Sequence, residues 1–289
     1  MSKVFVHIGA PKAASSTLQH FFHTNKKINF LGIIRDHKNY DGYKKYKNVF
    51  HNYCRHKNND FNKAKKIKKK ISKKKINLIS EEDIFTSQFA NFRKKIQRVI
   101  KIFPNCEFIV VLRDPIQSIK SWHNFDLRRD QNTPVDIIQY LKLHKKKVII
   151  DQIDYKKRIN YFKGLKLNKF HIINFNVIKE RNFTILEKIL GPKLNFENKI
   201  FFEKKNANFY FLNILFKKLP WIQKIKFILP KFFIRNLRNL LLNFKFFSNY
   251  KPPINQIESK FLNKFFIKQI RYYNLFFKKK SYITLNKLK

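Results

Sequence analysis

Short apolar runs alternate along the chain with segments in which apolar residues recur at helical spacing. Four runs of five or six residues are mostly apolar: 4–8, 76–80, 107–112 and 170–174. Strands of this kind are buried on both faces, and in alternation with helices they are typical of a parallel α/β sheet. The pattern therefore predicts repeated strand–helix units.

Helical segments between and after these runs complete the prediction. Leu18, Phe21 and Phe22 follow the first run at helical spacing, and a helix over 182–190 stops at Gly191 and Pro192. Apolar and basic residues continue toward the end of the chain without a further strand pattern. We expect an α/β fold in which a parallel sheet is flanked by helices, with a helical C-terminal portion.

Two basic segments interrupt this order within what we predict to be a single domain, 1–289. Segment 38–75 is a Lys-rich insertion, expected to hold exposed helix or to be mobile. Segment 209–250 is a basic aromatic helical segment, divided by Pro220 and Pro230. It either packs on the sheet as a helical subdomain or rests on anionic lipid as a peripheral membrane contact.

Composition adds a large positive charge to this picture. Hydrophobic residues make up 44% of the chain, including 33 Phe, so the chain should fold, and the formal net charge is +46. Such a charge favours polyanion partners, but only 12 of the 64 basic residues are Arg. Because Arg is the usual residue for reading bases, no specific nucleic-acid binding is predicted. Genomic drift toward A/T-rich codons, which encode Lys together with the abundant Asn, Ile, Phe and Tyr, is an alternative explanation for the excess of Lys.

Cysteine usage and hydropathy bear on the compartment. Cys54 and Cys106 are too few for a disulfide framework. The N-terminal apolar run is too short for a signal peptide, and Lys and Pro break the later runs 209–216 and 227–234 before about 18 residues, the length a spanning helix needs. These features predict a cytoplasmic protein.

The first chemical signal is the segment from Gly9 to Thr17, between the first strand and its helix. Backbone N–H groups of such a loop, the positive end of the helix and three hydroxyl groups form an anion site. Lys12 precedes the Ser and Thr residues instead of following a second glycine, so the spacing differs from that of Walker A. This argues against an ordinary ATPase or kinase.

The second signal, Arg113-Asp114-Pro115, stands at the end of the third predicted strand. Ligands of open α/β sheets bind at the carboxyl ends of the strands, so Arg113 and the first loop should face the same crevice. If Pro115 begins a helix, Ser121 lies two turns into it, where its hydroxyl joins Arg113 on a second phosphate.

Together these two elements resemble the family of sulfotransferases that use 3'-phosphoadenosine 5'-phosphosulfate (PAPS), particularly bacterial members with carbohydrate-type sulfotransferase domains. The first loop is similar to the family's 5'-phosphosulfate loop, P-K-x-G-T-T or P-K-x-A-S-T-T. Arg113 and Ser121, eight positions apart, are similar to its 3'-phosphate motif. The strand ending at Ser80-Glu81-Glu82, the unit from His171 to Gly191 and the stretch 252–277 extend the resemblance over most of the chain.

The resemblance implies a P-loop-like fold, PAPS as co-substrate and sulfuryl transfer to an acceptor hydroxyl or amine, expected on a saccharide or glycolipid. It implies that Arg113 and Ser121 hold the 3'-phosphate. The 5' group would be held by Lys12, Ala13, Ala14, Ser15, Ser16 and Thr17. Ala14 stands where the family more often has Gly, so we expect its φ to be negative.

Charge develops on the bridging oxygen as sulfur is transferred, and Lys12 is the candidate cation that stabilises it. A general base should deprotonate the acceptor. Glu82 is the first choice, with Glu81 and His123 as alternatives. The chemistry needs no metal ion, and no zinc site is predicted for the segment His51 to His56, because no second cluster of ligands accompanies it. The rival interpretation is a noncatalytic basic protein that binds polyanions or a membrane surface on the same fold.

Overall fold

The computed structural model describes residues 3–10, 12–32, 50–54, 61–129, 133–144, 149–165, 169–191, 194, 256–278 and 280–286. The chain divides into two compact units. The first comprises Met1–Ser118, Lys146–Phe201 and Ile267–Lys289, and the second comprises Ile119–Lys145 and Phe202–Phe266. The single domain expected from the sequence stays a prediction.

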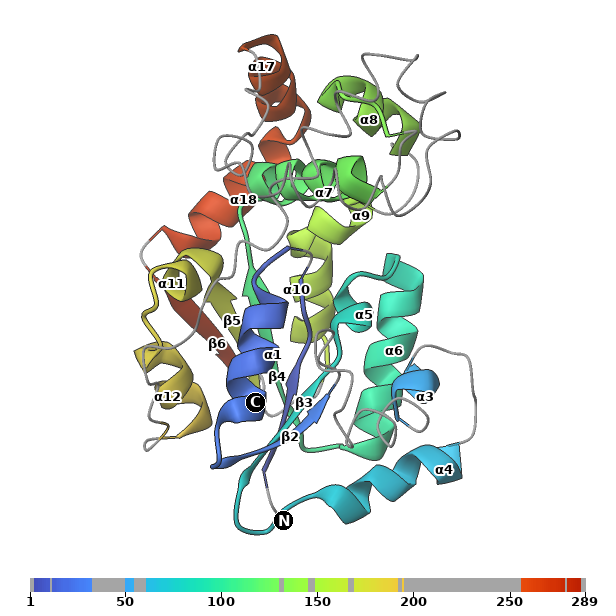
Figure 1. Ribbon diagram of the computed structural model, residues 1–289, viewed down its shortest axis with the longest axis vertical. Coiled ribbons are helices and arrows are strands. Elements are labelled where there is room, and N and C mark those ends of the chain that lie inside the picture. The colour runs from blue at the N-terminus through green and yellow to red at the C-terminus, as the bar shows by residue number, and fades with distance from the viewer. Residues whose placement is uncertain are drawn as a thin grey trace, which may run out of the picture. The chain divides into compact units, whose positions relative to one another are not determined.

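A six-stranded sheet forms the centre of the first unit (Figure 1). Its strand order is β2-β3-β1-β4-β5-β6. The first five strands pair in parallel, and β6 is antiparallel to β5. The strands are β1 (Val4–His7), β2 (Ile28–Gly32), β3 (Ile76–Ser80), β4 (Glu107–Leu112), β5 (Lys169–Asn174) and β6 (Tyr282–Asn286). The predicted α/β fold with a mostly parallel sheet is confirmed; β2 and β6 are additional to the four strands that we predicted.

The register aligns the carboxyl ends of β1 and β3, whereas β4 continues to Leu112, beyond its last pair with β1. His7, the last residue of β1, pairs with Ser80 of β3 and with Ile109 of β4. Beyond the strand ends, the N–H of Glu81 donates to the carbonyl oxygen of His7 at 2.9 Å. The segments that follow β1, β3 and β4 therefore leave the sheet at the same edge.

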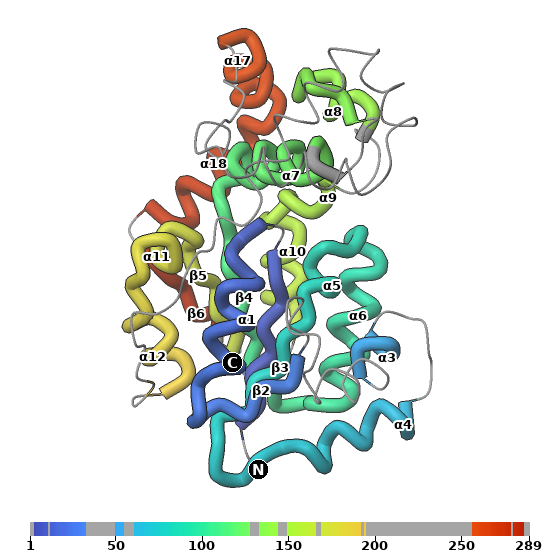
Figure 2. The backbone as a smooth tube through the Cα atoms, viewed as in Figure 1, coloured from blue at the N-terminus to red at the C-terminus, as the bar shows by residue number. Residues whose placement is uncertain are grey.

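Helices cover both faces of the sheet, as the tube in Figure 2 shows. On one face, α1 (Ser15–Thr24) packs against β1 through Phe22 and His7, whose rings lie 5.8 Å apart. Phe21 of the same helix stacks on Phe183, which precedes α12 (Thr184–Leu190).

The opposite face is covered by α6 (Phe89–Ile102) and α10 (Tyr155–Lys163). Phe162 of α10 stacks on Phe170 of β5 with ring centroids 3.8 Å apart, and Phe92 of α6 meets Phe162 edge-on. These aromatic side chains are buried, so burial of apolar area accounts for much of the attachment of both helices to the sheet. Among the described residues of this unit, the remaining helices are α3 (Asn52–Cys54), α4 (Phe61–Lys65), η2 (Lys66–Lys70), α5 (Glu82–Phe85), α9 (Ile149–Ile153), α11 (Phe175–Lys179) and α18 (Ile267–Phe277).

Within the Lys-rich segment 38–75, the described residues form α3, α4 and η2. Phe50, Tyr53 and Cys54 are buried, whereas the lysines of η2 are exposed. The segment 209–250 lies outside the described residues. The described residues of the closing stretch 252–277 include two helices, α17 (Gln256–Phe265) and α18.

The second unit holds most of α7 (Pro115–Arg129), together with α8 (Ile137–His144) and α17. The hydroxyl of Tyr140 donates to Asp126 Oδ2 at 2.7 Å, and Glu258 Oε1 accepts from the N–H of Ile137 at the start of α8. Across the described residues, no helix is both long and apolar enough to span a bilayer.

Candidate anion-binding site at the carboxyl edge of the sheet

Strand order places a switch point between β1 and β4. The chain leaves β1 toward β2 on one side and leaves β4 toward β5 on the other. In open α/β sheets the connections diverge at such a point, and ligands bind there beyond the carboxyl ends of the strands. The two segments predicted to bind anions follow these strands: the loop that begins at Gly9 follows β1, and Arg113 follows β4.

The loop after β1 has an unusual backbone. Lys12 and Ala14 have φ values of 57° and 60°, both in the left-handed region. The expectation of a negative φ at Ala14 was therefore wrong. Ala14 is the N-cap of α1, with ψ 24°, and no side-chain hydrogen bond caps this end of the helix. Because the chain must turn sharply from the strand into the helix, Ala14 takes a conformation that glycine adopts at no steric cost.

Ser15 begins α1 and is buried beneath this turn. Its Oγ has no hydrogen-bond partner among the described residues. Burial of an unpaired hydroxyl costs about 1–3 kcal/mol, which a ligand oxygen would recover. Ala13 is buried, Lys12 and Thr17 are half-buried, and Ser16 is exposed. The start of α1 thus offers an unpaired hydroxyl beside uncapped backbone N–H groups, which is a suitable arrangement for an anion.

Arg113, the first residue after β4, contacts the loop directly. Its Nη1 donates to the carbonyl oxygen of Lys12 at 3.0 Å, and its Cζ lies 4.6 Å from the centroid of the Phe175 ring. Its Nε is buried with no hydrogen-bond partner within the described part of the chain. Burial lowers the pKa of Arg113, although Tyr155 and Asp114 oppose this effect. The guanidinium group remains charged at neutral pH.

Two contacts fix the backbone around Arg113. The hydroxyl of Tyr155 donates to the carbonyl oxygen of Arg113 at 2.8 Å. Asp114 Oδ1 accepts from the N–H of Gln117 at 2.9 Å and so supports the first turn of α7. The predicted helix start at Pro115 is confirmed.

Glu82 and Glu81 have different surroundings at the end of β3. A Cβ placed on Gly9 would lie 2.8 Å from Glu82 Cγ and 2.4 Å from Ser15 Oγ, so the side chains of Glu82 and Ser15 both lie against this glycine. Glu81 Oε2 instead lies 2.6 Å from His51 Nδ1, and both side chains are buried. Of the two carboxylates, Glu82 is the one beside the loop.

His123 and Ser121, the other predicted site residues, lie on α7 in the second unit. His123 is buried; its Nε2 is 2.8 Å from the carbonyl oxygen of Pro134, and its ring is 4.7 Å from that of Tyr140. An Nε2 that donates to a carbonyl carries the proton, which leaves only Nδ1 to act as a base. The roles of His123 and Ser121 stay predictions.

A buried polar chain behind the loop was not expected from the sequence. Gln19 of α1 donates to Ser80 Oγ at 3.0 Å, and Ser80 Oγ lies 2.9 Å from His7 Nδ1. Burial lowers the pKa of His7 to about 4, so the ring is neutral at pH 7. The signal was present as polar residues in otherwise apolar strands. These bonds connect α1, β3 and β1 directly beneath the anion loop.

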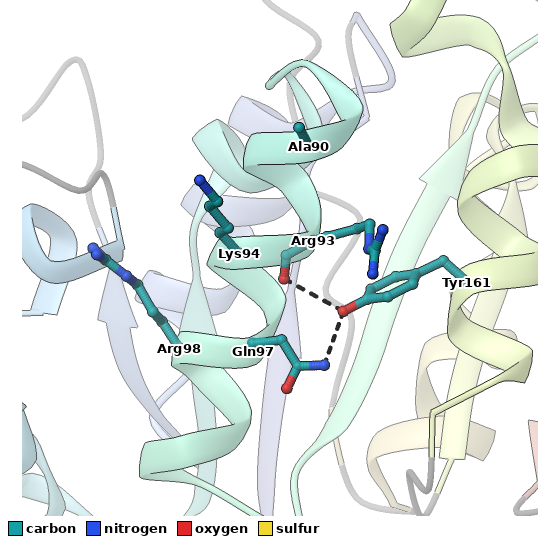
Figure 3. Close-up of a pocket in the computed structure, with 6 residues that line it drawn as sticks. All are labelled: Ala90, Arg93, Lys94, Gln97, Arg98 and Tyr161. Carbon is teal, nitrogen blue, oxygen red and sulfur yellow. Dashed lines mark hydrogen bonds between the residues drawn. The ribbon is translucent and has the colours of Figure 1, made fainter.

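A groove of about 690 Å³ is lined by residues of α6 and by Tyr161 of α10 (Figure 3). These residues are separate in the sequence from those of the anion-binding site. The lining of the groove contains Arg93, Lys94 and Arg98, and none of the described residues that line it is acidic. Arg93 lies against the ring of Tyr161, at 5.4 Å from the centroid, and Gln97 Nε2 donates to the Tyr161 hydroxyl at 3.0 Å. The groove is therefore a basic surface with an aromatic wall.

Among known proteins, the chain is similar to solved structures only at low sequence identity. No family model matches the chain, and no curated protein matches it either. Among solved structures, a sulfotransferase from Alicyclobacillus acidocaldarius is 12% identical, with a TM-score of 0.47 over 75% of this chain and 95% of that chain. Mouse sulfotransferase SULT7A1 complexed with PAP is also 12% identical, with a TM-score of 0.44 over 95% of this chain and 85% of that one. A structure of the PezAT toxin–antitoxin system of Streptococcus pneumoniae, 14% identical, has a TM-score of 0.28 over 60% and 68%.

Proposed function

We propose that this protein is a PAPS-dependent sulfotransferase. The observation that carries the proposal is the hydrogen bond from Arg113 to the Lys12 carbonyl oxygen at the β1–β4 switch point. It brings the two anion elements into contact, while Ser15 Oγ and Arg113 Nε are buried without hydrogen-bond partners in the described chain. A ligand with a 5'-phosphosulfate and a 3'-phosphate supplies oxygen acceptors for both.

In the proposed reaction the acceptor oxygen or nitrogen attacks sulfur in line, and the bond from sulfur to the bridging oxygen breaks. The electron pair of that bond goes to the 5'-phosphate of the departing nucleotide, where Lys12 stabilises the charge. The acceptor proton goes to a base, for which Glu82 is the candidate, because its side chain lies against Gly9 and next to Ser15. A saccharide or glycolipid hydroxyl remains the expected acceptor.

Calorimetric titration with 3'-phosphoadenosine 5'-phosphate (PAP), the desulfated product, tests the nucleotide site. We expect PAP to bind more tightly than ATP, and Arg113→Ala to weaken PAP binding by roughly 100-fold or more, since a charge-assisted contact is lost. Arg271→Ala is the matched control, because Arg271 is exposed on α18. Equal affinity for ATP and PAP, or equal loss in both variants, would reject the proposal.

Glu82→Gln separates binding from turnover. The variant keeps the shape of the side chain but cannot accept a proton, so we expect PAP to bind at least as well while sulfuryl transfer falls by roughly 100-fold or more. A screen with radiolabelled PAPS and a panel of saccharide acceptors provides the assay. Normal turnover in this variant would remove Glu82 from the mechanism.

One observation favours a second candidate function, binding of a polyanion. The α6 groove combines three cations with no lining acid in a chain of net charge +46. Under this alternative, binding of a sulfated polysaccharide should fall steeply with salt and should be insensitive to Arg113→Ala. The sulfotransferase proposal predicts instead that Arg113→Ala strongly weakens the binding of PAP.

A further inference from the structure

Three side chains that commonly ligate metals meet at the end of β3, although they come from two distant segments. His51 precedes α3, whereas Glu81 and Asp83 flank the start of α5. His51 Nδ1 lies 2.6 Å from Glu81 Oε2, and His51 Nε2 lies 3.9 Å from Asp83 Oδ2. One ligand atom from each residue falls within 4.8 Å of the other two.

Burial distinguishes this cluster from acidic groups on an open surface. The side chains of His51 and Glu81 are 5% and 3% exposed, and that of Asp83 is 23% exposed. The cluster is thus enclosed on the side of Glu81 and open to solvent at Asp83, which gives an ion a path of entry.

We propose that His51, Glu81 and Asp83 bind one divalent transition-metal ion of the zinc type. One imidazole nitrogen and two carboxylate oxygens are a donor set that zinc accepts, with a fourth position left for water. Glu81 and Asp83 approach different nitrogens of His51, and an ion would use only one of them, so it would replace the contact between His51 and Glu81. Zinc bonds of about 2.0–2.2 Å place ligand atoms roughly 3.0–3.5 Å apart, so atoms that now lie within 4.8 Å of one another would move by roughly 1 Å. The imidazole disfavours Mg²⁺ and Ca²⁺, which prefer oxygen ligands alone.

The neighbours of the cluster define what the ion would do. Lys95 Nζ donates to the carbonyl oxygen of Asp83 at 2.8 Å and fixes the start of α5. Cys54 is also buried, but it is not part of this group of clustered ligand atoms. An ion here would fasten the segment before α3 to the end of β3, one residue from Glu82. Its role is that of a clamp, and it does not depend on the proposed sulfotransferase activity.

Calorimetry of chelator-treated protein with ZnCl₂ alone, and separately with MgCl₂, tests the site. We expect one Zn²⁺ per chain, Mg²⁺ binding that is weaker by roughly 100-fold or more, and a higher melting temperature with zinc. Asp83→Asn and His51→Ala should each weaken zinc binding by roughly tenfold or more. His20→Ala, at an exposed histidine of α1, is the matched control and should leave it unchanged.

Asp83→Asn is the decisive variant, because Asp83 is partly exposed and its substitution is nearly isosteric, so it should fold even if His51→Ala does not. Far-UV circular dichroism checks the fold of both. Absence of zinc binding to the folded wild-type chain overturns the proposal, as does unchanged affinity in Asp83→Asn. PAP affinity is measured on the same preparations without zinc, so failure of the metal site and failure of the nucleotide site are distinguishable.

Discussion

Replacement of Ala14 by glycine should stabilise the protein, although a mutation to glycine usually does the opposite. Ala14 has φ 60° and ψ 24°, which crowds its Cβ against its own backbone and costs about 1–2 kcal/mol. Glycine removes that strain, but its greater backbone entropy in the unfolded chain lowers the stability of the folded protein by about 0.5–1 kcal/mol. Ala14 is also the N-cap of α1, a position where glycine is favoured over alanine by a further few tenths of a kcal/mol.

The three contributions give a net stabilisation of about 1 kcal/mol, equivalent to a rise in melting temperature of about 2–3 °C for a chain of this size. Ala13→Gly is the matched control. Ala13 is fully buried and is not among the residues with positive φ, so the same substitution should lower stability by about 1 kcal/mol through entropy and a lost buried methyl group.

Differential scanning calorimetry of the wild type and both variants gives the sign of each change. A rise in melting temperature for Ala14→Gly would support strain at Ala14, because the buried methyl group of Ala13 explains only the fall expected for Ala13→Gly. A fall in melting temperature for Ala14→Gly comparable to that of Ala13→Gly would refute the argument, because the left-handed conformation at Ala14 would then carry no strain.

Three further outcomes follow from single contacts. Because burial lowers the pKa of His7 from 6.5 to about 4, the unfolded chain binds a proton that the folded chain does not between these values. The free energy of unfolding should therefore fall by up to about 3 kcal/mol as the pH decreases through this window. Urea titrations at several pH values should show a weaker pH dependence for His7→Gln than for the wild type, and parallel curves for the two proteins would contradict this. Gly9→Ala should lower both the melting temperature and the affinity for PAP, since the new Cβ would lie 2.4 Å from Ser15 Oγ. Scanning fluorimetry with and without PAP measures both effects, and unchanged melting temperatures would show that the loop accommodates the methyl group. Tyr155→Phe removes the donor to the Arg113 carbonyl oxygen and should cost about 1 kcal/mol in chemical denaturation while weakening PAP binding; unchanged PAP affinity would limit Tyr155 to a structural role.

The strands that the sequence revealed are those buried on both faces. β4 is the clearest case, because all six of its residues are buried and its composition is almost entirely apolar. β2 escaped notice because only alternate residues are buried, and β6 because it pairs only at the antiparallel edge, with half-buried side chains. Local composition identifies central strands well, whereas the formation of an edge strand depends on pairing and packing with the adjacent strand.

At the site, the sequence predicted which residues meet where a general rule of sheet architecture applied. Arg113 and Lys12 are 101 positions apart, yet both follow central parallel strands, so the carboxyl-edge rule was sufficient. No such rule joins His51 to Glu81, because His51 comes from the Lys-rich segment, which has no strand of its own in the described residues. The backbone conformation of Ala14 was also mispredicted. Alanine usually has a negative φ, but the sharp turn from β1 into α1 imposes a positive one here.

Under the proposed sulfotransferase function, catalysis explains the placement of Glu82 better than anion binding alone does. A carboxylate beside an anion loop weakens the binding of a phosphate or sulfate through like-charge repulsion, so a site selected only for anion affinity would gain from a neutral residue there. Glu81, its neighbour, is turned toward His51, whereas the side chain of Glu82 lies against Gly9 and next to Ser15. A base is useful only within reach of the acceptor proton, and that requirement gives a reason to keep a negative charge next to the loop.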